Sequence, residues 1–375
     1  MAQRENWQLG RSMEYPYDGP PPKRQVAYVF DTNKCIECQT CTIACKTAWT
    51  SGKGQETIFW NNVETRPYGG YPAEWDLKLL EKQGPARWKG RRLASQTIFE
   101  GRGPLDAPLG HHPAERDYAA PNQGEDDVSQ EVEAGAHFGG VHSSWMFYLP
   151  RICNHCDHPA CLAACARKAI YKREEDGIVL IDQERCRGYQ DCVEACPYKK
   201  TFFNMVSRTS EKCIGCFPRV EQGQAALCVE GCIGKIRMHG FLTTDGEPRA
   251  DNPMDLLIKL ERIALPLYPQ FGTGPNVYYI PPLHVPDGIL EQMFGPGVAE
   301  AKARYRAAKE DEQLLGAMML FGSTNWIVRR FAVQEGEVVG YDYRDEEVVR
   351  VPFTEPHFVR PHHDAAHDVY RHNTT

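Results

Sequence analysis

The residues of this chain whose types and spacing could do chemistry are its cysteines. The chain contains 15 cysteines among 375 residues. Disulfide bonds cannot use up an odd number of thiols, and a chain of this length buries a core without covalent cross-links. Metal binding is therefore the first hypothesis to compare with the spacing.

Every cysteine belongs to one of four closely spaced groups. Group one has the pattern C-x2-C-x2-C-x3-C, which is typical of bacterial ferredoxins. In that pattern three thiolates hold one cubane iron–sulfur cluster, and the fourth thiolate ligates a second cluster. The groups are Cys35, Cys38, Cys41 and Cys45 (group one); Cys153, Cys156, Cys161 and Cys165 (group two); Cys186, Cys192 and Cys196 (group three); and Cys213, Cys216, Cys228 and Cys232 (group four).

Group three repeats group one with one substitution. The segments CIECQTCTIAC and CRGYQDCVEAC align without gaps, which places Tyr189 at the position of Cys38. A phenol has a pKa near 10, so at neutral pH it is a much poorer iron ligand than a thiolate. We therefore expect the iron at that corner of the cluster to be absent.

Zinc held by four tetrahedral thiolates is the alternative. Zinc suits separate C-x2-C pairs better than four consecutive groups of this kind, and group three offers three cysteines with no histidine nearby. Anionic clusters also need positive charge close to them. Several basic residues lie within a few positions of the cysteines and could supply this charge; the alternative is that they are ordinary surface residues. They are Lys34, Lys46, Arg185, Arg187, Lys199, Lys200 and Lys212.

The elements that position the cysteines can also be read from the pattern. Apolar runs at 27–30 and 177–181 precede groups one and three and predict strands, each followed by a cysteine loop and a short helix. The stretch 46–152 shows no helical or strand period, which indicates function, disorder or support from another chain. Further on, 254–267 and 297–320 read as amphipathic helices and 331–353 as strands joined by tight turns; the last twenty residues look like an arm.

Composition and motifs exclude several classes of protein. With 42% hydrophobic and 25% charged residues, the chain is not wholly disordered, and a net charge of −7 argues against nucleic-acid binding. The N-terminus has no apolar signal region. The longest uncharged run, Ile263–Pro286, contains six prolines and so does not predict a membrane-spanning helix. Nucleotide-binding and hydrolase motifs are missing, so we expect no catalytic residue in this chain.

Other candidate residues have a bland interpretation. His155 could be a fifth ligand, but donation of a hydrogen bond to sulfur is the favoured role. The run 271–282 could line a quinone or haem pocket, although a packing loop is the better interpretation. Histidines near the C-terminus could bind metal, but their irregular spacing favours a docking arm; these are His357, His362, His363, His367 and His372.

With its four groups in this order, the chain resembles the iron–sulfur (beta) subunits of molybdenum enzymes of the dimethyl sulfoxide reductase superfamily. Among these it is most similar to the beta subunits of respiratory nitrate reductase and nitrite oxidoreductase. The resemblance covers most of residues 26–290 and is weaker in 80–145 and in the C-terminal third. The segments that carry it are KCIECQTCTIACKTAWT, WNNVETRPYGGYP, residues 151–200, SEKCIGC and FGTGPNVYYIPP. Ala166 departs from the pattern, because such proteins often have proline there.

The resemblance implies an α+β fold of two ferredoxin-like double-cluster modules, with long loop insertions and a C-terminal helical and β extension. Groups one and four would form the first module, and groups two and three the second. The expected divisions are an N-terminal arm (1–25), the first module (26–62 and 205–245), a loop-rich insertion for partner contact (63–145), the second module (146–204), a helical region (246–330) and short strands with a C-terminal arm (331–375).

The resemblance also implies the ligands of three [4Fe–4S] clusters and one [3Fe–4S] cluster. Iron would be the only metal, and cysteines would be its only protein ligands. Tyr189 would stand at the vacant position of the fourth cluster. The ligand sets are Cys35, Cys38, Cys41 and Cys232 (first set); Cys213, Cys216, Cys228 and Cys45 (second set); Cys153, Cys156, Cys161 and Cys196 (third set); and Cys186, Cys192 and Cys165 (fourth set).

The implied function is electron transfer between a molybdopterin catalytic alpha subunit and a haem b gamma subunit or other membrane partner, in a nitrate reductase or nitrite oxidoreductase complex. The alternatives are the same role in an enzyme for chlorate, selenate, dimethyl sulfide or a hydrocarbon, and, more remotely, a zinc-binding structural or regulatory protein. We expect assembly in the cytoplasm into a membrane-associated complex. Export of the folded complex by a twin-arginine signal on the partner would explain why no signal is seen here.

Overall fold

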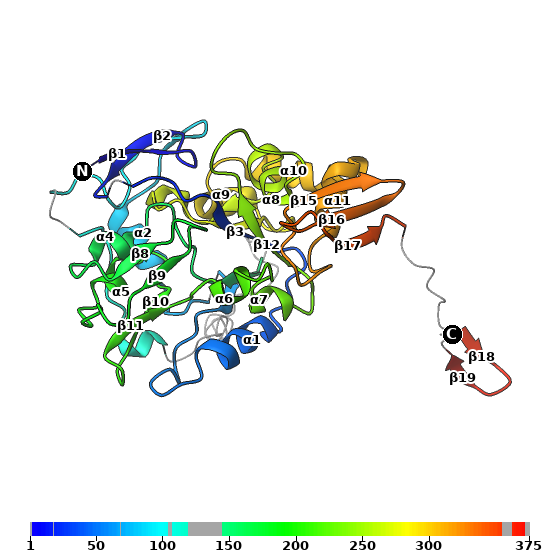
Figure 1. Ribbon diagram of the computed structural model, residues 1–375, viewed down its shortest axis with the longest axis horizontal. Coiled ribbons are helices and arrows are strands. Elements are labelled where there is room, and N and C mark those ends of the chain that lie inside the picture. The colour runs from blue at the N-terminus through cyan, green and yellow to red at the C-terminus, as the bar shows by residue number, and fades with distance from the viewer. Residues whose placement is uncertain are drawn as a thin grey trace, which may run out of the picture.

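The computed structural model of the chain mixes helices with small sheets (Figure 1). It describes residues 2–17, 19–67, 69–103, 107–118, 145–354 and 362–371. The chain begins with an antiparallel hairpin, β1 (Ala2–Asn6) and β2 (Arg11–Tyr15). This architecture agrees with the α+β class expected from the sequence.

A four-stranded sheet in the order β12-β3-β14-β13 lies at the centre of the molecule. Strand β3 (Gln25–Asp31) pairs antiparallel with β12 (Arg237–Leu242) and parallel with β14 (Val277–Ile280), and β13 (Leu265–Pro266) pairs with β14. The predicted strand 27–30 is therefore the middle of a longer strand.

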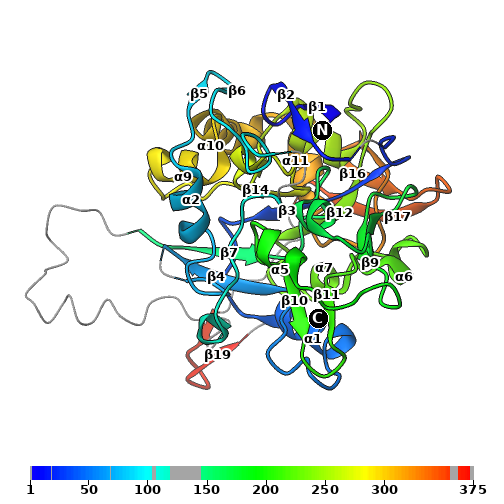
Figure 2. The same cartoon turned by 90° about the vertical axis from the view of Figure 1, so that its left-hand side faces the viewer.

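Both faces of β3 are covered, which explains why all seven of its residues are buried. Side chains alternate between the two faces of a strand. Val26, Tyr28 and Phe30 belong to one hydrophobic cluster, which also contains cysteines. Ala27 and Val29 belong to a second cluster that includes residues of the C-terminal helices. The sheet thus lies between the cluster that contains cysteines and a second cluster, whose C-terminal part comes from residues 308–338 (Figure 2).

Short helices carry the later cysteines of each group. Helix α1 packs against α7, and α4 packs against α5, so groups one and four meet, as do groups two and three. These helices are α1 (Thr40–Trp49), α4 (Ala160–Ala164), α5 (Asp191–Ala195) and α7 (Leu227–Glu230). A further helix, α6 (Phe217–Val220), directly follows Cys216. Two antiparallel strand pairs accompany them, namely β8 (Ile170–Lys172) with β9 (Val179–Ile181), and β10 (Thr201–Asn204) with β11 (Thr209–Lys212).

Part of the stretch between groups one and two is ordered around buried charges. Strand β4 (Asn62–Arg66) pairs with β7 (Phe147–Arg151). Glu64 on β4 is fully buried and pairs with Arg151, and it also accepts hydrogen bonds from the Tyr71 backbone N–H and the Trp75 indole. The other elements here are α2 (Leu77–Gln83), β5 (Trp88–Lys89), β6 (Arg92–Leu93) and η1 (Glu115–Tyr118). Because the buried side chains here include polar and charged ones, the sequence shows no regular spacing of apolar residues. The stretch therefore gave no sign of helices or strands in the sequence.

The helix expected over 254–267 is wrong in its length. The chain forms α8 (Pro253–Asp255) and a short π-helix, η2 (Leu256–Leu260), and then leaves the helix to add β13 to the central sheet. The run 271–282 lies in the core: η3 (Pro269–Phe271) leads into β14, all four of whose residues are buried. Most of the run therefore packs in the core, and Asn276 also lines a cavity that is described below.

The helices and strands predicted between 297 and 353 are confirmed. The helical pattern at 297–320 forms α10 (Val298–Arg306), η4 (Ala307–Glu310) and α11 (Glu312–Met319), preceded by α9 (Asp287–Phe294). The stretch 331–353 forms an antiparallel sheet of β15 (Arg330–Gln334), β16 (Glu337–Tyr341) and β17 (Glu347–Pro352). A last hairpin joins β18 (His362–Asp364) to β19 (Val369–Arg371). Among the helices of the described ranges, none has the length and apolar character needed to cross a bilayer.

Candidate metal centres

The four cysteine groups begin with the same backbone turn. In each group the residue two positions after the first cysteine has a positive φ: 55° at Glu37, 43° at His155, 68° at Gly188 and 62° at Gly215. Such left-handed residues turn the chain tightly and favour glycine, which occupies two of these positions. The sequence revealed the repeat of group one in group three, and the structure extends the repeat to all four groups.

Three of the four predicted ligand sets line separate small cavities of about 10–30 Å³ that open partly to solvent. One cavity is lined by Cys35, Cys38, Cys41 and Cys232, a second by Cys45, Cys213, Cys216 and Cys228, and a third by Cys165, Cys186, Cys192 and Tyr189. Each cavity therefore combines thiols from two different groups, as the three-plus-one pattern predicts.

The thiols of the remaining set also lie close together. Burial raises the pKa of the Cys161 thiol, and Cys196, Cys153 and Cys156 raise it further through like charge. The pKa of the Cys156 thiol is likewise raised by burial and by the like charges of Cys153 and Cys196. The structure thus brings together the members of all four predicted sets.

Most of these thiols would be poor ligands without a positive centre beside them. Burial raises the pKa of Cys35 to about 11 and that of Cys192 and Cys228 to about 12. A bound metal removes this barrier, because it ionises a coordinating thiol outright. Cys38 differs: it is exposed, and the Thr40 hydroxyl and backbone N–H lower its pKa.

Backbone N–H groups point at the sulfur atoms. Ala169 donates to Cys165 Sγ at 3.3 Å, Ser210 to Cys186 Sγ at 3.4 Å and Gly215 to Cys213 Sγ at 3.3 Å. Lys200 does the same for Cys196 Sγ at 3.5 Å. Hydrogen bonds to ligand sulfur are one of the means by which proteins stabilise iron–sulfur clusters and set their potentials.

Buried donors without partners give a further test of whether a cluster fits. The Nδ1 atoms of His155 and His239 accept hydrogen bonds from the Val179 and Ala226 backbone N–H groups, and burial lowers the pKa of both rings, to about 3 for His239. Each neutral ring therefore carries its proton on Nε2, which has no partner and is buried. His155 is thus placed for the favoured donor role, and cluster sulfur is an acceptor that fits.

The spacing of the thiols suits a cluster better than a single ion. In the described ranges, no group of three or more His, Cys, Asp or Glu residues converges closely enough to hold one metal ion. A tetrahedral zinc site requires four ligand atoms about 2.0–2.3 Å from one centre. A cubane instead takes one thiolate at each of four separate iron corners, so its four thiols need not converge on one point.

The predicted basic residues divide into two kinds. Lys199, Lys200 and Lys212 are buried, and the last of these lies between cysteine sets. The others make surface contacts: Lys34 pairs with Asp31, and Lys46, Arg185 and Arg187 donate to backbone carbonyl groups. Sequence reasoning missed Arg237, which lines the first cavity. Its position five residues after Cys232, at the start of an apolar strand, is the one signal that could have pointed to it.

Two of the C-terminal histidines have side chains that the structure describes. His363 and His367 each contact a neighbouring aspartate, Asp368 and Asp364 respectively. Only the backbone of His362 is described, and His357 and His372 lie outside the described residues. Their expected docking role stays a prediction.

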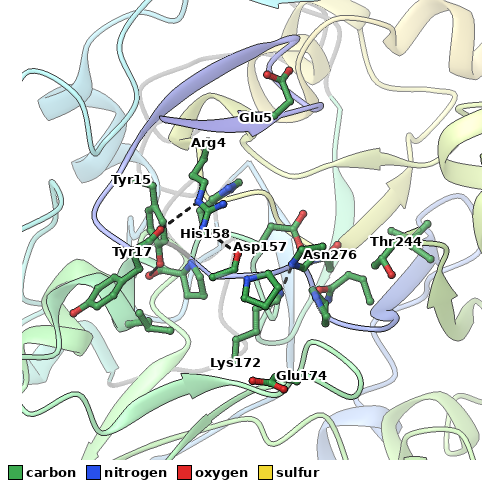
Figure 3. Close-up of a pocket in the computed structure, with 18 of the residues that line it drawn as sticks. Arg4, Glu5, Tyr15, Tyr17, Asp157, His158, Lys172, Glu174, Thr244 and Asn276 are labelled. Atoms are coloured by element: carbon green, nitrogen blue, oxygen red, sulfur yellow. Dashed lines mark hydrogen bonds and ion pairs between the residues drawn. The ribbon is translucent and has the colours of Figure 1, made fainter. Parts of the chain in front are cut away.

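A separate cavity of about 750 Å³ lies beneath the N-terminal hairpin (Figure 3). Its walls contain paired polar groups: Lys172 is 3.5 Å from Asp157, and Asn276 donates to Asp157 at 2.9 Å. The Tyr15 hydroxyl donates to the carbonyl of Pro159, two residues before Cys161. The hairpin is thus fastened to the segment that carries a cysteine of the third set.

Comparison with known proteins identifies the family. Residues 144–242, which contain groups two, three and four, match the family model of a 4Fe-4S dicluster domain. The chain is 44% identical to the selenate reductase subunit beta of Thauera selenatis and 45% identical to the chlorate reductase subunit beta of Ideonella dechloratans, each over 75% of this chain and 90% of the relative. It is 42% identical to the respiratory nitrate reductase subunit beta of Haloferax mediterranei, over 74% of this chain and 84% of the relative.

The chain belongs to the beta subunits of dimethyl sulfoxide reductase-family molybdenum enzymes. As a beta subunit it is the iron–sulfur, electron-transfer component of a molybdenum oxidoreductase. Membership of such complexes implies a molybdopterin catalytic subunit as partner. The family expected from the cysteine pattern is confirmed.

Proposed function

We propose that this beta subunit carries three [4Fe–4S] clusters and one [3Fe–4S] cluster on the four cysteine sets, in the order first to fourth. The gathering of all fifteen cysteines into these sets supports the proposal more than any other observation. Consecutive sets share an element: α1 holds Cys41 of the first set and Cys45 of the second. The second and third sets meet where Cys153 raises the pKa of the buried Cys213.

The third and fourth sets are linked in the same manner. Helix α5 holds Cys192 of the fourth set and is followed directly by Cys196 of the third. When bound, the clusters supply one-electron transfer between neighbouring sites. The chain itself holds them at fixed spacing and donates hydrogen bonds to their sulfur ligands.

We infer that the two ends of this row face different partners. Around the first set, Ile36, Ile43 and Ile233 are exposed by 56–67% although they are large and apolar. Around the fourth set, Tyr189, Met205 and Val206 are exposed by 61–76%. Clustered exposed apolar residues mark interaction surfaces. We assign the first surface to the molybdopterin subunit and the second to a haem b subunit or other redox partner.

The substrate belongs to the catalytic partner, and we propose an oxyanion. The relatives are named for selenate, chlorate, perchlorate and nitrate, with dimethyl sulfide as the exception at 41% identity. The nitrate or nitrite reaction expected from the sequence stays within this class. Identity with the Escherichia coli nitrate reductase 1 beta chain is lower, 34%, so the chlorate and selenate alternatives are at least as well supported.

Anaerobic purification of the native complex tests this function. We expect a brown protein with about 15 iron atoms per chain, no stoichiometric zinc, and a co-purifying large subunit that contains molybdopterin. Near-stoichiometric zinc with little iron would instead support the zinc-binding alternative. Turnover of each oxyanion by the purified complex then identifies the substrate.

A further inference from the structure

The face of the central sheet that meets the cysteines carries two basic side chains on one strand. Arg237 and His239 are alternate residues of β12, and they stand opposite Phe30 and Tyr28 on β3. The Arg237 guanidinium lies 4.4 Å from the centre of the Phe30 ring, and the His239 ring stacks on Tyr28 at 4.4 Å. Arg237 is charged and His239 is neutral, so the sheet presents one fixed positive charge to the cysteine side.

Arg237 lies between the first and second cysteine sets. It is 1% exposed, and its Nη2 donates to Cys41 Sγ of the first set at 2.9 Å while Nη1 donates to Asn61 at 2.9 Å. Burial raises the pKa of Cys228, a member of the second set, and both the charge and a hydrogen bond of Arg237 oppose that rise. One guanidinium therefore serves thiols of two sets, and its Nε is left buried without a partner.

Lys212 occupies the equivalent place between the second and third sets. It is 3% exposed and donates to the carbonyls of Val179 and of Cys213, the latter at 2.9 Å. Burial lowers the pKa of Lys212, but the thiols of Cys153, Cys161 and Cys213 outweigh burial and raise it overall. The Val179 N–H in turn donates to His155, which stands between Cys153 and Cys156, and Val179 packs in one hydrophobic cluster with Cys161. The ammonium group therefore lies between the second and third sets.

These two charges lack the usual compensation. In the part of the chain that the structure describes, neither Arg237 nor Lys212 forms an ion pair with a carboxylate, and the groups that raise their pKa values are cysteines. Lys200 is also buried, but the negative charge of the Glu64 carboxylate already stabilises its ammonium group. Removing a charge from water costs several kcal/mol unless an anion is close. Thiolate-bound clusters are the anions that fit these positions.

We propose that Arg237 and Lys212 are shared countercharges, each of which raises the reduction potentials of the two clusters on either side of it. Arg237 acts on the first and second clusters, and Lys212 on the second and third. Reduction adds negative charge to a cluster, and a cation in a poorly hydrated interior stabilises that added charge. This inference rests on the proposed cluster ligation and deepens it, because it names which residues set the potentials.

The fourth set supplies an internal reference. Its hydrogen bonds come from the neutral backbone N–H groups of Ala169 and Ser210. The potential of the fourth cluster should therefore be insensitive to both substitutions. Any change that spreads to the fourth cluster would indicate a general disturbance of the fold.

The test is a redox titration of the purified complex, followed by electron paramagnetic resonance so that each cluster is read separately. Arg237→Met should lower the potentials of the first and second clusters, and Lys212→Met those of the second and third. We expect roughly a tenfold change in each reduction equilibrium, which is about 59 mV for a one-electron couple. Arg237→Lys and Lys212→Arg keep the charge and should restore most of each potential.

Lys302→Met is the matched control, because Lys302 is a buried lysine of α10 that donates to Asp287 and to the Val285 carbonyl. It should leave all four potentials unchanged. If Arg237→Met loses a cluster, the proposal is tested with Arg237→Gln and with the two Lys212 variants, Lys212→Met and Lys212→Arg. Potentials that stay in place, or that move at one cluster alone, overturn the shared-countercharge proposal. A wild-type complex without clusters would instead refute the proposed function.

Discussion

The loops of groups one and three have the same backbone and different chemistry. Glu37 and Gly188 share a positive φ, as do Gln39 and Gln190, which precede the two cysteine helices. At the equivalent corner, however, one loop offers the exposed thiol of Cys38 and the other the phenol of Tyr189. The repeat therefore gives two loops of one shape, and a single side chain sets whether the corner offers a thiol or a phenol.

The surroundings of the two loops differ as well. Arg237 donates to the first set, whereas neutral N–H groups donate to the fourth. Behind the first loop, Thr65 on the charged ribbon β4–β7 donates to Glu37 at 2.6 Å. Behind the third loop lies the turn of the β10–β11 hairpin, where an added Cβ on Gly188 would come within 2.4 Å of the Arg208 carbonyl. Each difference gives an experiment.

The largest effect should come from the last cysteine of each group, which ligates the cluster of another group and not that of its own loop. Cys45→Ser should damage the cluster of Cys213, Cys216 and Cys228 more than the cluster of its own loop, because Cys45 lines the former cavity. Cys196→Ser is the counterpart and should damage the third cluster. Spectroscopy of each variant checks this, and a loss confined to the first cluster would refute the exchange of ligands.

Exchanging the corner residue should change the iron content by about one atom. Tyr189→Cys supplies the missing thiol, so the fourth set should accept a fourth iron and the paramagnetic signal of the oxidised three-iron cluster should disappear. Cys38→Tyr is the reverse experiment in the first loop. If the oxidised wild-type complex shows no three-iron signal, we have misassigned the role of Tyr189.

The charged ribbon behind the first loop should be essential to stability. Glu64→Gln leaves Arg151 without its partner, so the free energy of unfolding should fall by about 3–5 kcal/mol. Burial raises the pKa of Glu64, but the charges of Arg151, Arg66 and Lys200 outweigh burial and hold it below its usual value.

The same shift predicts how stability depends on pH. A carboxylate whose pKa is lowered by folding contributes fully above its unfolded pKa of about 4.3, and the contribution is lost as the pH falls further. Thermal unfolding of the wild type should therefore show an acid decline that is weaker in Glu64→Gln. Glu347→Gln, at an exposed ion pair with Arg350, is the control and should behave as the wild type does.

The smallest effect should come from the turn of the third loop. Gly188→Ala places a side chain at φ 68° against the Arg208 carbonyl, so we expect a loss of about 1–2 kcal/mol. Gly288→Ala is the matched control, because nothing lies within 4 Å of an added Cβ there. Equal melting temperatures for the two variants would show that the turn relaxes without cost.

The sequence predicted the parts of this molecule that repeat. Cysteine spacing predicted which thiols would meet, and apolar runs predicted β3 and β9, because each pattern is local. Arg237, Glu64 and the β4–β7 ribbon escaped prediction, since buried charges have no period and find their partners far along the chain. The helix expected at 254–267 failed for a related reason: pairing of β13 with β14 outweighed local helix propensity.

The order of the cysteines along the chain has a consequence for biogenesis. Groups two and three are adjacent in sequence, so they are synthesised together. Helix α1, in contrast, packs against α7, which leaves the ribosome much later. Domains generally fold as they emerge during synthesis. The inner pair of groups can therefore complete its thiol sets first, while the thiols of group one stay unpaired until Cys232 has been made. Iron insertion should accordingly begin in the middle of the polypeptide, and the nascent N-terminal cysteines need protection from oxidation in the interval.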